Sequence, residues 1–201
     1  MNTLEAIKMR KSVRSYLAKP LEEDKVKAVA EAGDMAAKAG QVTLNVITNP
    51  EILRMISETG VQVMKNSGNP FLEKVASVPD YSPIYDSPAM IVVSAETTED
   101  TMAVGMNTAN CACAAQNMLL AATELGLGSC YIVSGTLAFM VPEVKATAGI
   151  AENMTPSCAV IIGYTEDSAP HADAMKIPIT LSIADKYMRD YIKIPETIFL
   201  F

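Results

Sequence analysis

The segment from Glu99 to Leu125 constrains the fold of this 201-residue chain more than any other feature. Its pattern predicts the longest helix of the chain, and small or apolar residues occupy nearly every side of it. A helix of this kind is expected to be buried, because it presents no continuous polar face to water. Its many alanines also let neighbouring elements approach closely. The sequence therefore predicts a central helix with other elements packed around it.

The composition indicates one domain, spanning residues 1–201, with much apolar surface to cover. Half of the residues are hydrophobic and 19% are charged, so we expect a large core or a subunit interface. A net charge of −7 argues against nucleic-acid binding, which needs a basic surface. No apolar run reaches the roughly 18 residues of a membrane span, and the N-terminus lacks a signal-peptide core. We therefore expect a cytoplasmic protein that does not cross a membrane.

Local patterns predict helices and strands on both sides of the central helix. Asn2 and Glu5 have the spacing of a capping box, and Asn49-Pro50 is typical of a helix start. A long loop with a helical piece is expected over 65–87, where prolines and a glycine interrupt the pattern. The further helices are expected at about 3–9, 21–37, 50–60 and 142–148. The strands are expected at 42–48, 89–95, 128–133 and 157–164.

A cationic cluster near the N-terminus is the most informative candidate for chemistry. Lys8, Arg10, Lys11 and Arg14 fall within seven positions of a chain that has 16 lysines and arginines. The guanidinium fork of arginine matches phosphate oxygens, and Ser12 adds a hydroxyl donor. The alternative is a solvated, basic helix C-terminus that complements the helix dipole. The short R-x-S-x-R pattern alone leaves both interpretations open.

The other reactive residue types predict neither a metal site nor a hydrolytic site. The four cysteines lack a C-x-x-C spacing, and their apolar surroundings favour buried free thiols in a reducing compartment. His171, the single histidine, has no obvious partner for a hydrolytic triad and is expected on a surface loop. Phe71, Tyr81 and Tyr85 lie in the long loop, where they could line a substrate pocket or only anchor the loop.

Taken together, several segments of the chain resemble the nitroreductase family. The similarity begins with LEAIKMRKSVRSYLAKPLEEDKV and continues through VITNPEILRMI and PIYDSPAMIVVSA. The best-matched stretch is NTANCACAAQNMLLAATELGLGSCYI, and CAVIIGY follows it. These segments occur in the order of the family and cover most of residues 3–164.

The resemblance implies an α+β fold, in which helices wrap a mostly antiparallel sheet. It implies a homodimer formed through the long central helix, with two FMN molecules at the interface and both chains in contact with each. Residues 165–201 form a C-terminal extension that ends in Ile198-Phe-Leu-Phe201. Because an exposed apolar end favours aggregation, this extension is expected to pack on the partner subunit.

The resemblance also implies which residues bind FMN. The residues of the R-x-S-x-R turn correspond to phosphate and ribityl ligands, and Lys11 to a backbone contact next to the flavin. After the strand that follows the central helix, small residues would let backbone N–H groups reach the flavin near N5 or O4; a plain turn is the alternative there. The full predicted set is Arg10, Lys11, Ser12, Arg14, Gln41, Val133, Ser134, Gly135 and Lys176.

Three features depart from the family pattern. The loop after the second helix lacks the usual Asn-x-Gln-Pro-Trp-like segment, so Gln41 is the available replacement in the shortened 37–41 stretch. No arginine lies between Gly163 and Tyr187, which leaves Lys176 as the substitute for a C-terminal phosphate ligand. The aromatic fraction is 5% with no tryptophan, so the stacking wall beside the flavin is expected to be thinner.

The activity implied is that of an NAD(P)H-dependent FMN oxidoreductase with a ping-pong mechanism. NADH or NADPH would deliver hydride to flavin N5, and a small electron-poor acceptor such as a nitroaromatic, quinone or enone would then be reduced. The cofactor carries this chemistry, so the protein needs no nucleophile or metal. Two alternatives are a flavin-binding protein with little turnover, acting as electron carrier or flavin store, and a flavin-free dimeric interaction protein.

Overall fold

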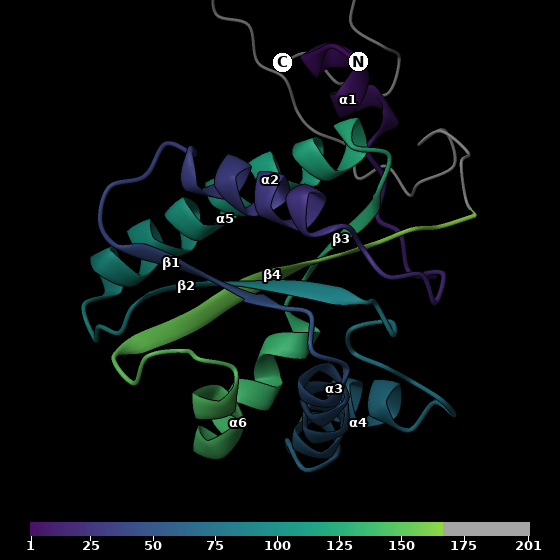
Figure 1. Cartoon of the computed structure of the whole chain (residues 1–201). Coiled ribbons are helices and arrows are strands. Elements are labelled where there is room, and N and C mark those ends of the chain that lie inside the picture. Colours follow the sequence, from purple (N-terminus) through teal and green to yellow (C-terminus); the bar gives the residue numbers. More distant parts are fainter. Residues whose placement is uncertain (167–201) are drawn as a thin grey trace, which may run out of the picture. The chain divides into compact units, whose positions relative to one another are not determined.

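A computed structural model describes residues 1–166 of the chain (Figure 1). The helices are α1 Thr3–Met9, α2 Glu23–Asp34, α3 Pro50–Lys65, α4 Pro70–Ala76, α5 Thr101–Glu124, the 3₁₀ helix η1 Ser134–Met140, and α6 Pro142–Thr147. The strands are β1 Val42–Ile47, β2 Ala89–Glu96, β3 Gly128–Ile132 and β4 Met154–Gly163. The predictions for Lys176, for His171 and for nearly all of the C-terminal extension lie outside the described residues.

The four strands form one antiparallel sheet in the order β1-β2-β4-β3. The two central strands are buried almost throughout, and in β2 every residue from Ala89 to Ala95 is buried. This burial explains why both strands read as continuous apolar runs rather than alternating ones, since each has a packed layer on both faces. The predicted α+β class with a mostly antiparallel sheet is confirmed.

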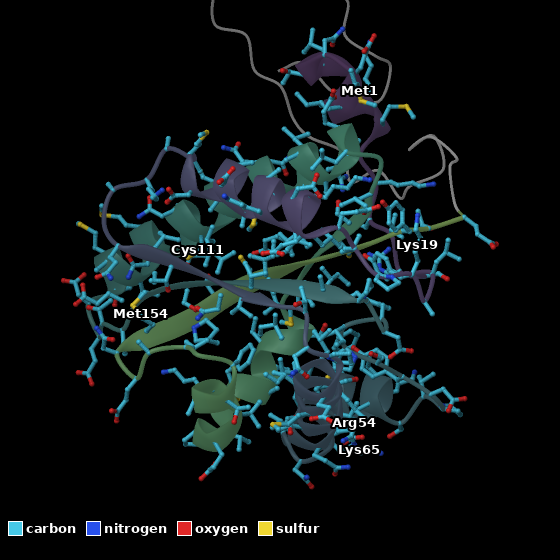
Figure 2. The ribbon with its side chains drawn as sticks, in the orientation of Figure 1. Met1, Lys19, Arg54, Lys65, Cys111 and Met154 are labelled. Atoms are coloured by element: carbon cyan, nitrogen blue, oxygen red, sulfur yellow. The ribbon has the colours of Figure 1, made fainter. Side chains whose placement is uncertain are left out.

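Helices cover both faces of the sheet (Figure 1). Ile91 and Val93 belong to the core shared with α2 and α5, whereas Met90 and Val92 belong to the core shared with α3, η1 and α6. This division follows from the pleat, which turns successive side chains to opposite faces. Helix α5 lies against the sheet, and Cys111 on its inner face is buried (Figure 2). The fold is thus a three-layer arrangement around β2 and β4.

Helix α5 is buried on one face only in the described chain. The prediction of a helix buried on nearly all sides is therefore wrong for a single subunit. Its inner face supplies Ala114, Ala115 and Met118 to the core. The exposed residues that recur at helical spacing are all uncharged, and we call them the α5 stripe. The α5 stripe consists of Met102, Gly105, Met106, Ala109, Ala112, Cys113 and Gln116.

The start of α3 was predicted correctly but its end was not. The Asn49 side chain accepts hydrogen bonds from the first turn, and Pro50 occupies the first helical position. The helix then continues through Gly60 to Lys65. Gly60 does not end the helix, because it is a packing position: a Cβ there would lie 3.1 Å from the Pro83 ring. The glycine is needed for close approach rather than for a turn.

Residues 1–166 show neither a membrane-spanning helix nor a metal site. None of their helices is both long and apolar enough to span a bilayer. No group of three or more His, Cys, Asp or Glu side chains could hold a metal ion in this part of the chain. All four cysteines are free thiols. Cys111, Cys130 and Cys158 are buried as predicted, but the prediction is wrong for Cys113, which is exposed because it lies on the outer side of α5.

Candidate cofactor-binding site

The predicted phosphate-binding segment runs beside the edge strand β3. Arg10 ends α1 in an extended conformation, and Ser12 then forms an isolated parallel bridge with Ser129. The Val13 amide donates to the Ser129 carbonyl at 2.9 Å. The Val13 side chain is buried against Gly128, where a Cβ would lie only 2.9 Å from Val13 Cγ1. The segment is therefore fixed to the sheet through both main-chain and side-chain contacts.

Tyr16 and Leu17 anchor the other end of this segment. The Tyr16 hydroxyl donates to the Val13 carbonyl at 2.8 Å, and the Leu17 amide donates to the Tyr164 carbonyl at 2.8 Å, just beyond β4. The Tyr16 ring lies so close to the main chain that a Cβ at Gly163 would be 2.7 Å from it. Burial raises the pKa of Tyr16 above its ordinary value, so the hydroxyl stays protonated as a donor.

Three predicted ligands converge on the thiol of Cys130. Burial raises the pKa of this thiol, while the Arg14 charge, a hydrogen bond from Ser12 and the Arg10 charge lower it in part. Arg14 is exposed, and its guanidinium carbon lies 6.0 Å from the centre of the Tyr85 ring. Lysine 11, between these ligands, is half-buried. The bridge between Ser12 and Ser129 thus places this segment along β3, with both arginines close enough to Cys130 to influence its thiol.

The second predicted group, Val133 to Gly135, follows β3 and begins η1. Val133 is 50% exposed, whereas the Ser134 hydroxyl donates to the Pro83 carbonyl at 2.9 Å. Gly135 is buried, and a Cβ there would lie 2.8 Å from Cγ2 of Ile84. The small residues at 134 and 135 therefore allow close packing against the loop between α4 and β2, which contains Pro83 and Ile84. The segment is a helical start rather than a plain turn.

The loop between α4 and β2 joins the two predicted groups. Arg14 faces Tyr85, and Ser134 is bonded to Pro83 in the same loop. Tyr85 and Asp86 have φ values of 52° and 51°, in the left-handed region that non-glycine residues rarely adopt. Strained backbone of this kind tends to occur at functional sites, where the surrounding structure holds it in place. The loop is therefore part of the candidate site.

Two of the three aromatic candidates lie at this site. Tyr85 is beside Arg14, and Tyr81 hydrogen bonds with Ser134. Burial raises the pKa of Tyr81, and the bond with Ser134 partly offsets that. Phe71 is 71% exposed on α4 and is not placed with them. Tyr81 and Tyr85 are half-buried, which fits the interpretation that they anchor the loop.

Sequence reasoning missed Tyr131, although a signal for it exists. Tyr131 is 40% exposed and alternates along β3 with the buried Cys130 and Ile132. The period of a strand could have identified it as the outward residue next to Val133. Burial, followed by the neighbouring Cys158, raises the pKa of Tyr131 to about 12. The hydroxyl of Ser129, on the same face of β3, is buried and has no hydrogen-bond partner in the described part of the chain.

Gln41 lies away from the other predicted ligands within one chain. Gln41 precedes Val42, which is linked through β2 to Thr155 at the start of β4. Ser129, beside the other predicted ligands, pairs instead with Ile162 near the end of β4. At about 3.3 Å per residue, that separation along β4 is roughly 23 Å. The preceding loop is held on α5, because Ala39 and Asn110 exchange hydrogen bonds of 3.1 and 2.6 Å.

A pocket of about 710 Å³ is lined in part by the loop between α4 and β2. Lys19, from the segment before α2, and Arg54 of α3 line it from two elements (Figure 2). Its walls are mostly apolar and include Leu53 and Ile84. None of the predicted cofactor-binding residues within 1–166 lines this pocket. The pocket is thus separate from the cluster beside β3, though both share the loop before β2.

Comparison with known proteins identifies the family. A protein of Methanothermobacter thermautotrophicus, provisionally named an NADH dehydrogenase/NAD(P)H nitroreductase, is 28% identical over 84% of this chain and 80% of its own length. The NADPH-flavin oxidoreductase of Vibrio harveyi is 29% identical over 83% of this chain and 67% of its own length. A nitroreductase from Bacteroides fragilis, crystallised with bound FMN, superposes with a TM-score of 0.79 at 29% identity, covering 92% of this chain and 100% of that one. The model of the nitroreductase family matches residues 7–164, and the chain belongs to this family.

Proposed function

We propose that this chain binds FMN and transfers electrons from NADH or NADPH to a small electron-poor acceptor, such as a nitroaromatic, quinone or enone, by a ping-pong mechanism. The observation that carries the proposal is the bridge between Ser12 and Ser129, which places Arg10, Ser12 and Arg14 along the β3 edge, within electrostatic reach of Cys130. Membership of the nitroreductase family and the FMN bound to the Bacteroides fragilis relative support it.

The donor set beside β3 fits the phosphate end of FMN. Arg10 and Arg14 each offer a planar fork of N–H donors, and charge-assisted bonds to phosphate are stronger than neutral ones. Ser12 adds a hydroxyl, and its main chain is bridged to Ser129, whose buried hydroxyl has no hydrogen-bond partner among residues 1–166. Because side chains alternate along a strand, the Ser129 hydroxyl lies on the face opposite the Cys130 thiol, so Arg10, Ser12 and Arg14 form the donor set without it.

The flavin end of FMN would lie toward Val133 and the loop before β2. Val133 and Tyr131 form the exposed outer face of β3, and Tyr85 stands beside Arg14. When bound, FMN supplies the electron transfer between the nicotinamide and the acceptor. The residues of this chain would hold the phosphate, orient the ring against β3 and exclude water from one side. No protein nucleophile is required by this assignment.

We propose further that two chains form a homodimer through the α5 stripe. The stripe is uncharged, and Met102 and Met106 on it are 77% and 49% exposed. Exposed apolar patches on a soluble protein mark interaction surfaces, and a two-fold axis would pair the stripe with its own copy. Because Ala39 is bonded to Asn110 of α5, the dimer would carry Gln41 of one subunit toward the site of the other.

A visible absorbance spectrum of the purified protein, taken before and after anaerobic NADH or NADPH, tests the proposal. We expect flavin bands that bleach when the nicotinamide is added and return with a quinone or nitroaromatic. Protein that shows no flavin band even after incubation with FMN would contradict the proposal. It would leave Arg10 to Arg14 as a basic helix end and the dimer as a flavin-free interaction protein.

A second candidate function is a flavin carrier or store with little turnover. The observation that favours it is the position of the shortened 37–41 loop, whose Ala39 is bonded to α5 and whose Gln41 lies far from Arg14 in the same chain. Without a polar side chain from this loop, the flavin face would lack a residue that orients substrates. A yellow protein that neither NADH nor NADPH bleaches would favour this function over the oxidoreductase.

A further inference from the structure

The phenol of Tyr16 is the only aromatic hydroxyl of residues 1–166 that bonds to the main chain of the segment from Arg10 to Arg14. It donates to the Val13 carbonyl at 2.8 Å. We propose that Tyr16 is a positioning residue, which holds the Val13 main chain so that Ser12 and Arg14 face the FMN phosphate. This inference rests on the proposed function and adds to it a residue that does not itself touch the cofactor.

The main chain of Val13 is held from both sides. Its amide donates to the Ser129 carbonyl of β3 at 2.9 Å, and its carbonyl accepts the Tyr16 hydroxyl. Its side chain fills the space that only a glycine at 128 leaves open. Ser12 and Arg14 flank Val13 and therefore leave the chain in directions set by these contacts. Losing the bond to Tyr16 would free the carbonyl and, with it, the peptide that leads into Arg14.

The Tyr16 ring packs against the main chain at Gly163 and against the core shared with α3, η1 and α6. A Cβ at Gly163 would lie 2.7 Å from Cδ1 of Tyr16 and 2.7 Å from Cδ of Pro88, so the ring occupies space that any larger residue would take. The adjacent Leu17 amide is bonded to the Tyr164 carbonyl. Because these contacts hold the ring without its hydroxyl, Tyr16→Phe removes the bond to Val13 and leaves the packing in place.

Binding of FMN and of riboflavin by the full chain distinguishes positioning from packing. Riboflavin carries the same ring and ribityl chain but no phosphate. We expect Tyr16→Phe to raise the FMN dissociation constant about threefold to tenfold, the effect of one lost hydrogen bond, and to leave riboflavin binding nearly unchanged. Flavin fluorescence quenching measures both. The matched control is Tyr164→Phe, which removes bonds to Lys25 and Glu22 and should not change FMN binding.

A double-mutant cycle with Arg14→Gln tests whether Tyr16 acts through the segment. In the Arg14→Gln background, Tyr16→Phe should weaken FMN binding by less than it does in the wild type, because coupled residues are not additive. Equal losses for FMN and riboflavin, or full additivity, would overturn the positioning role while FMN binding by the wild type still supports the proposed function. A wild-type chain that binds no FMN would overturn both.

Discussion

The centre of the sheet and its β3 edge are built differently. In β2, every side chain from Ala89 to Ala95 is buried, and in β4 all six residues from Cys158 to Gly163 are buried as well. At the edge, by contrast, Ser12 and Arg14 are exposed, and Tyr131 and Val133 keep 40% and 50% of their surface. Burial supplies most of the free energy of folding, whereas exposed polar groups are available to a ligand. The centre and the edge should therefore respond to mutation through different measurements.

The largest effect is expected from a truncation at the centre. Ile161 of β4 is fully buried between strands and helices, so Ile161→Ala should lower the free energy of unfolding by about 2–5 kcal/mol through lost burial and a new cavity. Denaturant titration of the flavin-free protein measures this. Val133→Ala, at the half-exposed end of β3, should change stability by no more than about 0.5 kcal/mol. Similar losses for the two variants would remove the distinction between centre and edge.

The reverse pattern is expected for Arg14→Gln at the edge. Hydrogen bonds to charged groups contribute about 1.5–3 kcal/mol, so FMN affinity should fall by about tenfold or more. The stability of the flavin-free protein should hardly change, since Arg14 is exposed. Arg54→Gln is the control, because that arginine is exposed on α3 and pairs with Glu58. If both variants weaken FMN binding equally, general charge rather than position explains the affinity.

Alkaline pH should weaken the centre through Cys158. Burial is the main cause that raises the pKa of this thiol to about 12, from an ordinary value of 9.0. The contribution of the protonated Cys158 thiol to stability is fully present below pH 9 and is lost as pH rises toward 12. The reason is that this thiol loses its proton at lower pH in the unfolded chain than in the folded one. Between pH 9 and 10 the loss should be about 1 kcal/mol. Cys158→Ala should reduce the slope of this pH dependence, and the remaining slope comes in part from Cys111 and Cys130, whose pKa values burial also raises. The control Cys113→Ala removes an exposed thiol and should not reduce the slope.

The smallest effects are expected for two buried hydroxyls that have no hydrogen-bond partner among residues 1–166. Ser94 lies at the centre, next to the irregularity in the pairing of β2 with β4, and Ser129 lies at the edge. Removing an unsatisfied hydroxyl relieves its desolvation, so Ser94→Ala and Ser129→Ala should each raise the free energy of unfolding by up to about 1 kcal/mol. Thermal unfolding checks this. A clear loss of stability in Ser129→Ala would reveal a partner for that hydroxyl in the flavin-free protein.

Much of the fold could be predicted from local patterns. The capping box of Asn2 and Glu5 is present, and the apolar run after Pro88 forms a central strand. Signals of this kind are local, since caps and strand periods involve neighbouring residues. Helix η1 was missed because no side chain caps its start, so it carries no start signal. The full length of α3 was missed because Gly60 is explained only by its contact with Pro83.

The candidate site was only partly predictable for the same reason. Arg10, Ser12 and Arg14 form a local cluster of chemically suitable residues, and the structure brings them together. The role suggested for Tyr16 and the closeness of the arginines to Cys130 depend on pairing between the N-terminal segment and β3, which no local pattern reveals. The binding roles of the predicted residues stay predictions until FMN titrations are made.

The bridge between Ser12 and Ser129 has a consequence for the order of folding. Its two partners are separated by most of the described chain, so the contact cannot form before β3 has been synthesised. Contacts between residues so distant in sequence close large loops and are slow to form. During translation, the arginines near the N-terminus would leave the ribosome before β3 has been synthesised. A ligand that needs this arrangement cannot assist early collapse, and its uptake would report the last stage of maturation.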